Sequence, residues 1–259
     1  VTGVQTFALP IYSHSFTLVD PYNYKKLKKK FNNKKIKICN KAPIQKEIKK
    51  FDLIIFAVKP QIADRVLSEY KNFEFKKNSI ISSIIAGKKI IFFKKRLKNA
   101  NQFVRIMPNM PALIRNGISC FASSNNLSVK NKKTINKLFL KVGKTVWLNN
   151  ESQIDKATAV SGSGPGYVFA LINSFEKAAK KLGFSKNQSR ELVLTTFLGS
   201  IYLMQETKKE PDDLEKSIAV KGGTTEAGIK NLKNNNIDNI IYKTYMAAYK
   251  RAKILGKKN

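Results

Sequence analysis

The chain has 259 residues, enough for one large domain or two modest ones with a substantial core. Its 49 lysines and arginines against 17 acids give a formal net charge of +32, and no run of about 18 apolar residues is present that could cross a membrane. Two cysteines and one histidine are too few for a structural zinc site or a disulfide framework, so we expect a cytoplasmic protein that holds no metal.

The first half of the chain alternates between strand and helix patterns. The continuous apolar run 52–58 is typical of a parallel strand that is buried on both faces. We expect strands at residues 15–20, 35–39, 52–58, 79–86, 103–107, 118–122 and 145–148, and helices at 22–31, up to 48, 62–70, up to 97 and 134–142. The alternation predicts an α/β fold with a doubly wound parallel sheet.

Ligands of such sheets bind beyond the carboxyl ends of the strands. That geometry selects Asp20 and residues 57–60, 86–87 and 107–111 as binding candidates. The segment 105–111, Arg-Ile-Met-Pro-Asn-Met-Pro, places Asn109 between two prolines, which predicts a rigid loop at the ligand edge. An ordinary turn that ends the strand is the alternative.

The second half carries only helical patterns. We expect helices at residues 153–160, 164–182, 186–208, 212–220, 224–232 and 237–254. Within 192–204, apolar residues occur on more than one face, and a helix that is apolar all round is usually buried. In a small helical domain this pattern predicts a dimer interface.

Two segments in this half have the composition of binding loops. Residues 161–167, Ser-Gly-Ser-Gly-Pro-Gly-Tyr, predict a tight loop whose free N–H groups approach a ligand or a neighbouring backbone, with an interdomain turn as the alternative. Residues 221–228 place two glycines, Thr224 and Thr225 at a helix start, near Glu226 and Glu215. This second segment predicts a site for a carboxylate or phosphate, and a threonine N-cap after a glycine turn is its alternative. No Ser/His/Asp or Cys/His set points to hydrolysis.

Five motifs, in order, resemble those of pyrroline-5-carboxylate reductases, which use NAD(P)H to complete proline synthesis. They lie at residues 57–61, 83–87, 105–112, 161–167 and 222–228, and the resemblance runs from about residue 15 to the C-terminus. It implies a Rossmann-like dinucleotide-binding domain at 14–152 and a helical dimerisation and substrate domain at 153–259. The expected assembly is a homodimer or a higher homo-oligomer.

The resemblance also implies roles for single residues. Asp20, Ala57, Val58, Lys59, Pro60, Ala86, Asn109 and Ser217 would bind the dinucleotide, with Asn109 beside the nicotinamide. The amides of Gly222 and Gly223, next to Thr225, would hold the substrate carboxylate. Thr224 would be the catalytic residue, with its hydroxyl bonded to the ring nitrogen. A cyclic iminium is already electrophilic, so alignment matters more than a strong acid or base.

The opening of the chain departs from the family pattern. A first strand and a glycine-rich phosphate loop should precede Phe16, but the sequence contains no G-x-G-x-x-G, and residues 1–13 resemble a non-native leader. Without that loop the pyrophosphate loses its main backbone donors, so we expect little activity from this chain and turnover from a chain that carries the loop.

Several alternatives stay open. Asp20 at a strand end favours NAD, whereas nearby Lys25 and Lys26 and the family favour NADPH, which we expect. The activity alternatives are a related imine or ketone reductase and a catalytically impaired member of the family. A basic nucleic-acid-binding protein is the non-enzyme alternative, and we do not favour it. Only six of the basic residues are arginine, and the lysines occur with many asparagines and isoleucines, as A/T-rich codons would produce.

Overall fold

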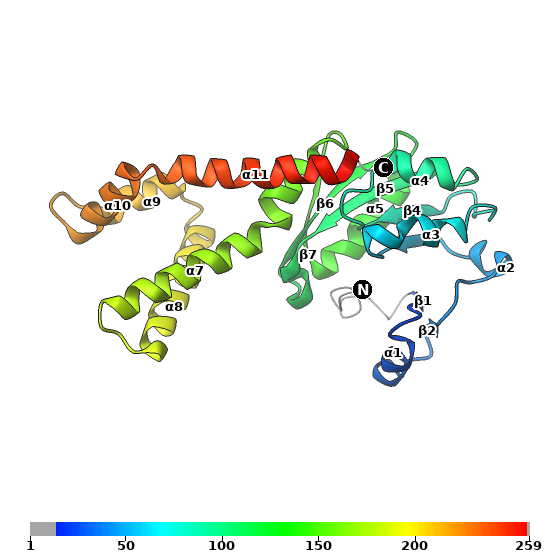
Figure 1. Ribbon diagram of the computed structural model, residues 1–259, viewed down its shortest axis with the longest axis horizontal. Helices are drawn as coiled ribbons and strands as arrows, with labels where there is room; N and C mark the ends of the chain where they lie inside the picture. Colours follow the sequence, from blue (N-terminus) through cyan, green and yellow to red (C-terminus); the bar gives the residue numbers. More distant parts are fainter. Residues whose placement is uncertain (1–13, 258–259) are drawn as a thin grey trace. The chain divides into compact units, whose positions relative to one another are not determined.

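The computed structural model describes residues 14–257 and confirms the α/β class of the first half (Figure 1). The elements there are β1 (Phe16–Val19), α1 (Tyr24–Lys30), β2 (Ile36–Cys39), α2 (Gln45–Ile48), β3 (Leu53–Phe56), η2 (Pro60–Ile62), α3 (Ala63–Ser68), β4 (Ile80–Ser83), α4 (Ile90–Arg96), β5 (Gln102–Pro108), η3 (Met110–Ile114), β6 (Gly117–Ser123), α5 (Val129–Phe139), η4 (Leu140–Val142) and β7 (Gly143–Trp147). Residues 1–13, which we expect to be a non-native leader, lie outside the described part of the chain.

The strands form two sheets rather than the single parallel sheet that the sequence predicts. One sheet pairs β1 with β2 in parallel, and the other has the order β3-β4-β5-β6-β7. Among residues 14–257, no strand pairs with the second edge of β1 or of β3, so the two sheets remain separate. In the larger sheet, β6 runs antiparallel to β5 because the connection 109–116 is shorter than a parallel crossover requires.

Two apolar clusters hold the larger sheet against its helices. One joins Phe56 and Ile81 of the strands to Leu67 of α3 and Phe93 of α4. The other joins Ile80, Val104, Ile106 and Phe121 of the strands to Ile135 of α5. Together the buried residues of the two clusters come from β3, β4, β5 and β6, so close packing fixes the strands that form the carboxyl edge of this sheet.

The second half is helical throughout, as the sequence predicts. Its elements are α6 (Gln153–Ala157), η5 (Thr158–Gly162), α7 (Gly164–Lys181), α8 (Lys186–Thr207), α9 (Pro211–Ile218), α10 (Thr224–Asn234) and α11 (Ile237–Lys257). The prediction of a tight loop at 161–167 is wrong. Residues 158–162 form a π-helical turn, and α7 begins at Gly164 with only Ser163 between them. Ser161 stabilises this turn, since its hydroxyl donates to the Ala157 carbonyl over 2.9 Å.

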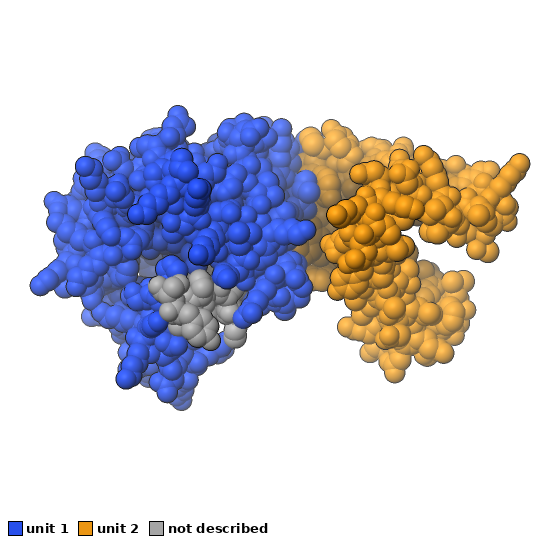
Figure 2. Space-filling model, turned by 180° about the vertical axis from the view of Figure 1, so that it is seen from behind, with its two compact units in different colours: residues 1–163, 248–259 blue, residues 164–247 orange. Residues whose placement is uncertain are grey.

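The described chain divides into two compact units (Figure 2). The first contains the described residues up to Ser163 together with α11 from Ala248, and the second is Gly164–Ala247. Within the second unit α7 packs beside α8 (Figure 1), yet only Ser189 and Val193 are buried there. No helix in the described residues is both long enough and apolar enough to cross a lipid bilayer.

Candidate active site

The carboxyl edge of the larger sheet gathers most of the residues predicted to bind the dinucleotide. Register pairs Phe56 with Ser83 and Ser83 with Arg105, so the three parallel strands β3, β4 and β5 end at the same edge. The segments that follow these strands contain residues 57–60, Ala86 and Asn109, and they lie along the same edge, although β5 continues to Pro108 beyond its pairing with β4. Asp20 follows β1 and belongs to the other sheet.

Asn109 has a fixed orientation at this edge. Its Oδ1 accepts a hydrogen bond from the Ile118 N–H over 2.8 Å, and its own N–H donates to the Ile118 carbonyl over 3.2 Å. The side-chain amide nitrogen has no partner among the described residues. Asn109 can therefore offer a positioned N–H donor to a ligand carbonyl or carboxamide.

Small residues occur in the two loops that follow β3 and β4. Ala86 is exposed, and Gly87 next to it has φ +75°, a conformation that favours glycine. In the other loop Ala57 is half-buried, Val58 packs against the core, and Lys59 is exposed at the start of η2, where Pro60 is the first residue. Small side chains at Ala57, Ala86 and Gly87 favour the close approach of a ligand to the backbone of these loops.

Asp20 uses its carboxylate to hold the turn into α1. Oδ1 accepts from the backbone N–H groups of Tyr22 and Asn23 at 3.0 and 2.9 Å, and Oδ2 accepts from the Asn23 side chain at 3.0 Å. Partial burial raises the pKa of Asp20, but these hydrogen bonds outweigh it and leave the pKa below the ordinary value. Asp20 is thus ionised at neutral pH and already has three donors.

The predicted substrate residues lie in the second unit, in the turn between α9 and α10. The Gly222 N–H donates to Glu226 Oε2 over 2.7 Å, and the Gly223 N–H donates to the Val220 carbonyl over 2.9 Å. Gly223 is the N-cap of α10 and Thr224 is its first residue, so the alternative of a threonine N-cap is wrong. Ser217, at the end of α9, donates its hydroxyl to Leu214.

Unpaired donors remain at the start of α10. Within the described chain, the backbone N–H groups and the hydroxyls of Thr224 and Thr225 make no hydrogen bond. Thr224 is exposed and Thr225 is half-buried. Free N–H groups at the positive end of a helix dipole bind anions, and the Glu226 carboxylate already occupies the adjacent Gly222 amide.

The sequence did not assign roles to two groups that the structure reveals. Buried Arg105 on β5 pairs with Asp155, and Glu226 bonds to Gly222. The acidic spacing of Glu151 and Asp155 in a very basic chain was a usable signal for the first group. A carboxylate four residues after a glycine was the signal for the second.

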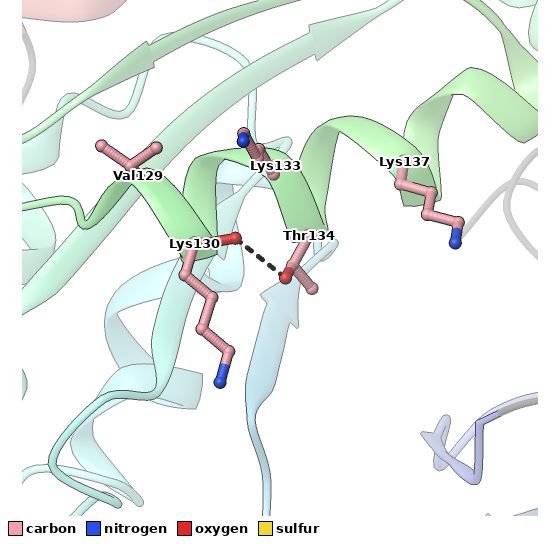
Figure 3. Close-up of a pocket in the computed structure, with 5 residues that line it drawn as sticks. All are labelled: Val129, Lys130, Lys133, Thr134 and Lys137. Carbon is pink, nitrogen blue, oxygen red and sulfur yellow. Dashed lines mark hydrogen bonds between the residues drawn. The ribbon is translucent and has the colours of Figure 1, made fainter.

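One surface hollow lies away from both groups of candidate residues. It is lined by Val129, Lys130, Lys133, Thr134 and Lys137, which all extend from the single helix α5 (Figure 3). Thr134 donates to the Lys130 carbonyl within that helix. Lysines on one solvated helix face provide no convergent polar groups, so we assign no site there.

Comparison with known proteins identifies relatives of this chain. A family model described as pyrroline-5-carboxylate reductase dimerisation matches residues 151–255. The pyrroline-5-carboxylate reductase of Pseudomonas aeruginosa is 34% identical over 201 residues, which cover 78% of this chain and 73% of that protein. The reductase of Aquifex aeolicus is 32% identical over 204 residues, with coverage of 79% and 75%.

Solved structures agree with the sequence relatives. A pyrroline-5-carboxylate reductase from Coxiella burnetii has a TM-score of 0.81 and 26% identity, covering 93% of this chain and 98% of that one. A Plasmodium falciparum pyrroline carboxylate reductase with NADP bound has a TM-score of 0.77 and 25% identity, covering 94% and 98%.

Proposed function

The chain belongs to the pyrroline-5-carboxylate reductase family, and from that premise we propose how it reduces 1-pyrroline-5-carboxylate to L-proline. The substrate binds at the start of α10, and the nicotinamide cofactor binds along the carboxyl edge of the larger sheet. The unpaired amides and hydroxyls of Thr224 and Thr225 are the observation that carries this proposal.

The substrate carboxylate is held by the first amides of α10. The N–H groups of Thr224 and Thr225 have no other partner in the described chain, whereas the Gly223 N–H is already used by the turn. The Gly222 N–H joins them when the substrate carboxylate replaces that of Glu226. A helix N-terminus favours this negative charge.

Thr224 orients the ring of the substrate. Its exposed hydroxyl can donate to or accept from the ring nitrogen, depending on the protonation of that nitrogen. Reduction adds a hydride to the imine carbon, the π pair of the C=N bond moves to nitrogen, and the product amine carries the proton of the iminium. The reduced nicotinamide supplies the hydride. The residues named here align the ring and need not provide a strong acid.

The residues of the sheet edge fit the nicotinamide end of the cofactor. Asn109 presents its unpartnered amide nitrogen, and Ala57 and Ala86 are small enough for close approach. The sequence offers no G-x-G-x-x-G to receive the pyrophosphate. We therefore confine the assignment to residues 57–60, Ala86 and Asn109, with Ser217 as a further contact once its hydroxyl leaves Leu214.

We propose NADPH as the preferred cofactor. The Asp20 carboxylate is engaged by its own turn, which leaves it poorly placed to receive the ribose hydroxyls that select NAD. Lys25 and Lys26 are exposed on α1 directly after that turn, and lysines attract a 2′-phosphate. Measured kcat/KM should be higher with NADPH than with NADH, and Lys25→Ala with Lys26→Ala should reduce that preference.

The protein is a homo-oligomer through the matched dimerisation region, and we propose a homodimer built on α7 and α8. The second unit buries only Ser189 and Val193 by itself. Phe169, Phe175, Leu198 and Tyr202 are all about half exposed or more, which is typical of an apolar interface rather than a solvated surface. A second copy would cover these side chains.

We propose the cytoplasm as its location. Cys39 and Cys120 are free thiols, half-buried and buried respectively. Reducing compartments keep thiols in this state. Fractionation of the source cells would test this assignment.

Glu226→Ala tests the substrate site. Removal of this exposed carboxylate frees the Gly222 amide and removes a negative charge beside an anionic substrate. Such an exposed charged hydrogen bond is worth about 0.5–1 kcal/mol, so the KM for pyrroline-5-carboxylate should fall about twofold to fivefold. Glu206→Ala, on α8, is the matched control and should leave the KM unchanged. A KM that rises in Glu226→Ala would contradict the assignment.

A further inference from the structure

Arg105 is a buried charge that the proposed reaction does not use. Its side chain is 4% exposed, and Nη2 donates to Asp155 Oδ1 over 2.9 Å. Nη1 lies 3.6 Å from Glu151 Oε1 and has no hydrogen-bond partner in the described chain. A buried arginine needs compensating charge, and Glu151 and Asp155 provide it from the segment that leads into and forms α6.

Glu151 extends this group to the loop after β4. Its Oε1 accepts the Ile90 N–H over 2.7 Å, and Ile90 is the first residue of α4. The N-cap residue Lys89 makes no side-chain capping bond. Glu151 therefore satisfies a donor at the helix start from outside the helix, and it ties the end of the 84–89 loop to the buried arginine.

Two further contacts hold the same loop. Lys88 is buried, with its Nζ 4.1 Å from the centre of the Phe92 ring. Gly87 lies against the last turn of α11: a Cβ at Gly87 would be 3.1 Å from the Leu255 carbonyl oxygen. Gly256 is buried in the same place, and a Cβ there would be 3.5 Å from the Gly87 carbonyl oxygen and 3.9 Å from Asp155 Oδ2.

We propose that Arg105, Glu151 and Asp155 are positioning residues, which fix the 84–89 loop and thereby set the affinity for the nicotinamide cofactor. The inference rests on the proposed function, because Ala86 of this loop is assigned to the cofactor there. Loss of the Ile90–Glu151 bond lets the loop sample conformations that do not bind the cofactor. The observed Kd therefore rises in inverse proportion to the fraction of molecules whose loop stays competent.

The test uses Glu151→Ala, Glu151→Gln and the unaltered chain. Arg105 variants are avoided because they leave the buried Asp155 carboxylate unpaired and can prevent folding. Glutamine keeps an oxygen that accepts the Ile90 N–H, so it is the conservative rescue. Glu47→Ala is the matched control, because Glu47 forms an exposed ion pair with Lys37 elsewhere in the same unit.

Two quantities are measured: hydrogen exchange of the amides in 84–90 without cofactor, and the Kd for NADPH by fluorescence titration. In Glu151→Ala we expect exchange at Ile90 to accelerate about tenfold and the Kd to rise about fivefold to tenfold, with the KM for pyrroline-5-carboxylate unchanged. Glu151→Gln should restore most of both, and Glu47→Ala should change neither.

Three results would overturn the inference: unchanged exchange at Ile90, acceleration of all slow amides by one common factor, and local acceleration with an unchanged Kd. The titration is repeated on a chimera in which a strand and glycine-rich loop from a relative precede Phe16, because the absent G-x-G-x-x-G alone can weaken binding. If that chimera binds no NADPH, the cofactor site of the proposed function fails. Exchange at Ile90 then still decides whether Glu151 fixes the loop.

Discussion

Replacement of Thr224 by alanine separates a catalytic hydroxyl from a structural one. Thr224 is exposed, it is the first residue of α10, and its hydroxyl makes no hydrogen bond within the described chain. The capping position belongs to Gly223. Removal of the hydroxyl therefore breaks no bond of the folded protein, and alanine is the stronger helix former by up to about 0.7 kcal/mol. The free energy of unfolding should stay the same or rise slightly.

The rate of hydride transfer should fall in the same variant. A hydrogen bond from Thr224 to the ring nitrogen is worth about 0.5–1.5 kcal/mol. Since about 1.36 kcal/mol corresponds to a tenfold change in rate, we expect a loss of about threefold to tenfold. NADPH affinity should not change, because Thr224 is not assigned to the cofactor.

Single-turnover oxidation of NADPH by bound substrate measures this rate in a chimera that carries a strand and glycine-rich loop from a relative before Phe16, and urea denaturation of the same chimera measures the stability. Thr134→Ala is the matched control, because Thr134 is also an exposed helical threonine but lies on α5. An unchanged single-turnover rate in Thr224→Ala would refute the catalytic assignment. Thr134→Ala removes a hydroxyl that donates to the Lys130 carbonyl, so a loss of stability in Thr224→Ala as large as in Thr134→Ala would refute the structural argument.

Three further predictions concern the framework. Gly87→Ala should lower the free energy of unfolding in urea by about 1–3 kcal/mol, because φ is +75° and the new Cβ would lie 3.1 Å from the Leu255 carbonyl oxygen. In Gly256→Ala the nearest atom to the new Cβ is 3.5 Å away, so the free energy of unfolding should stay the same or rise. The pKa of Asp20 is lowered in the folded protein, so its contribution to the free energy of unfolding is complete above the unfolded pKa of about 3.9 and is lost as pH falls through the folded pKa. In Asp20→Asn the free energy of unfolding, measured by denaturation against pH, should lack this acid-dependent loss. Curves of the same shape for wild type and variant would disprove the hydrogen-bonded role. Leu198→Lys, at a residue 53% exposed on α8, should shift sedimentation from dimer to monomer, whereas Val129→Lys on α5 should not; a dimer that survives Leu198→Lys would move the interface elsewhere.

Local patterns predicted most of the secondary structure. The strands at 52–58 and 103–107 correspond to β3 and β5, and α8 and α11 begin at the expected residues. The antiparallel direction of β6 could have been predicted from the sequence, since the connection 109–116 is too short for a parallel crossover. The separation of β1 and β2 into their own sheet could not be predicted from local patterns, because it depends on which strands pair in the folded chain.

Residues 161–167 show why composition alone failed. Glycine, serine and proline disfavour helix interiors, but Pro165 lies in the first turn of α7, where its missing N–H costs nothing. Gly162 packs under Met107, whose Cε would be 2.6 Å from a Cβ at that position. This contact joins residues far apart in sequence, so it overrides local preference and is invisible to it.

The candidate site was predicted in part. Strand ends and a glycine–threonine helix start marked residues 57–60, Asn109 and Thr224 from local sequence. The engagement of the Gly223 amide and the Glu226 contact depend on turn geometry, which the sequence left open. Arg105 and Asp155 are 50 residues apart, so the spacing of the acids hints at a buried partner but does not identify it as Arg105.

Oxidation of NADPH in the presence of 1-pyrroline-5-carboxylate, with L-proline measured as the product, tests the central claim most directly. It should be run on this chain and on a chimera in which a strand and glycine-rich loop from a relative precede Phe16. We predict proline formation by the chimera and much slower turnover by the chain itself, because no G-x-G-x-x-G is present to hold the pyrophosphate. A folded chimera that binds NADPH and forms no proline would contradict the account.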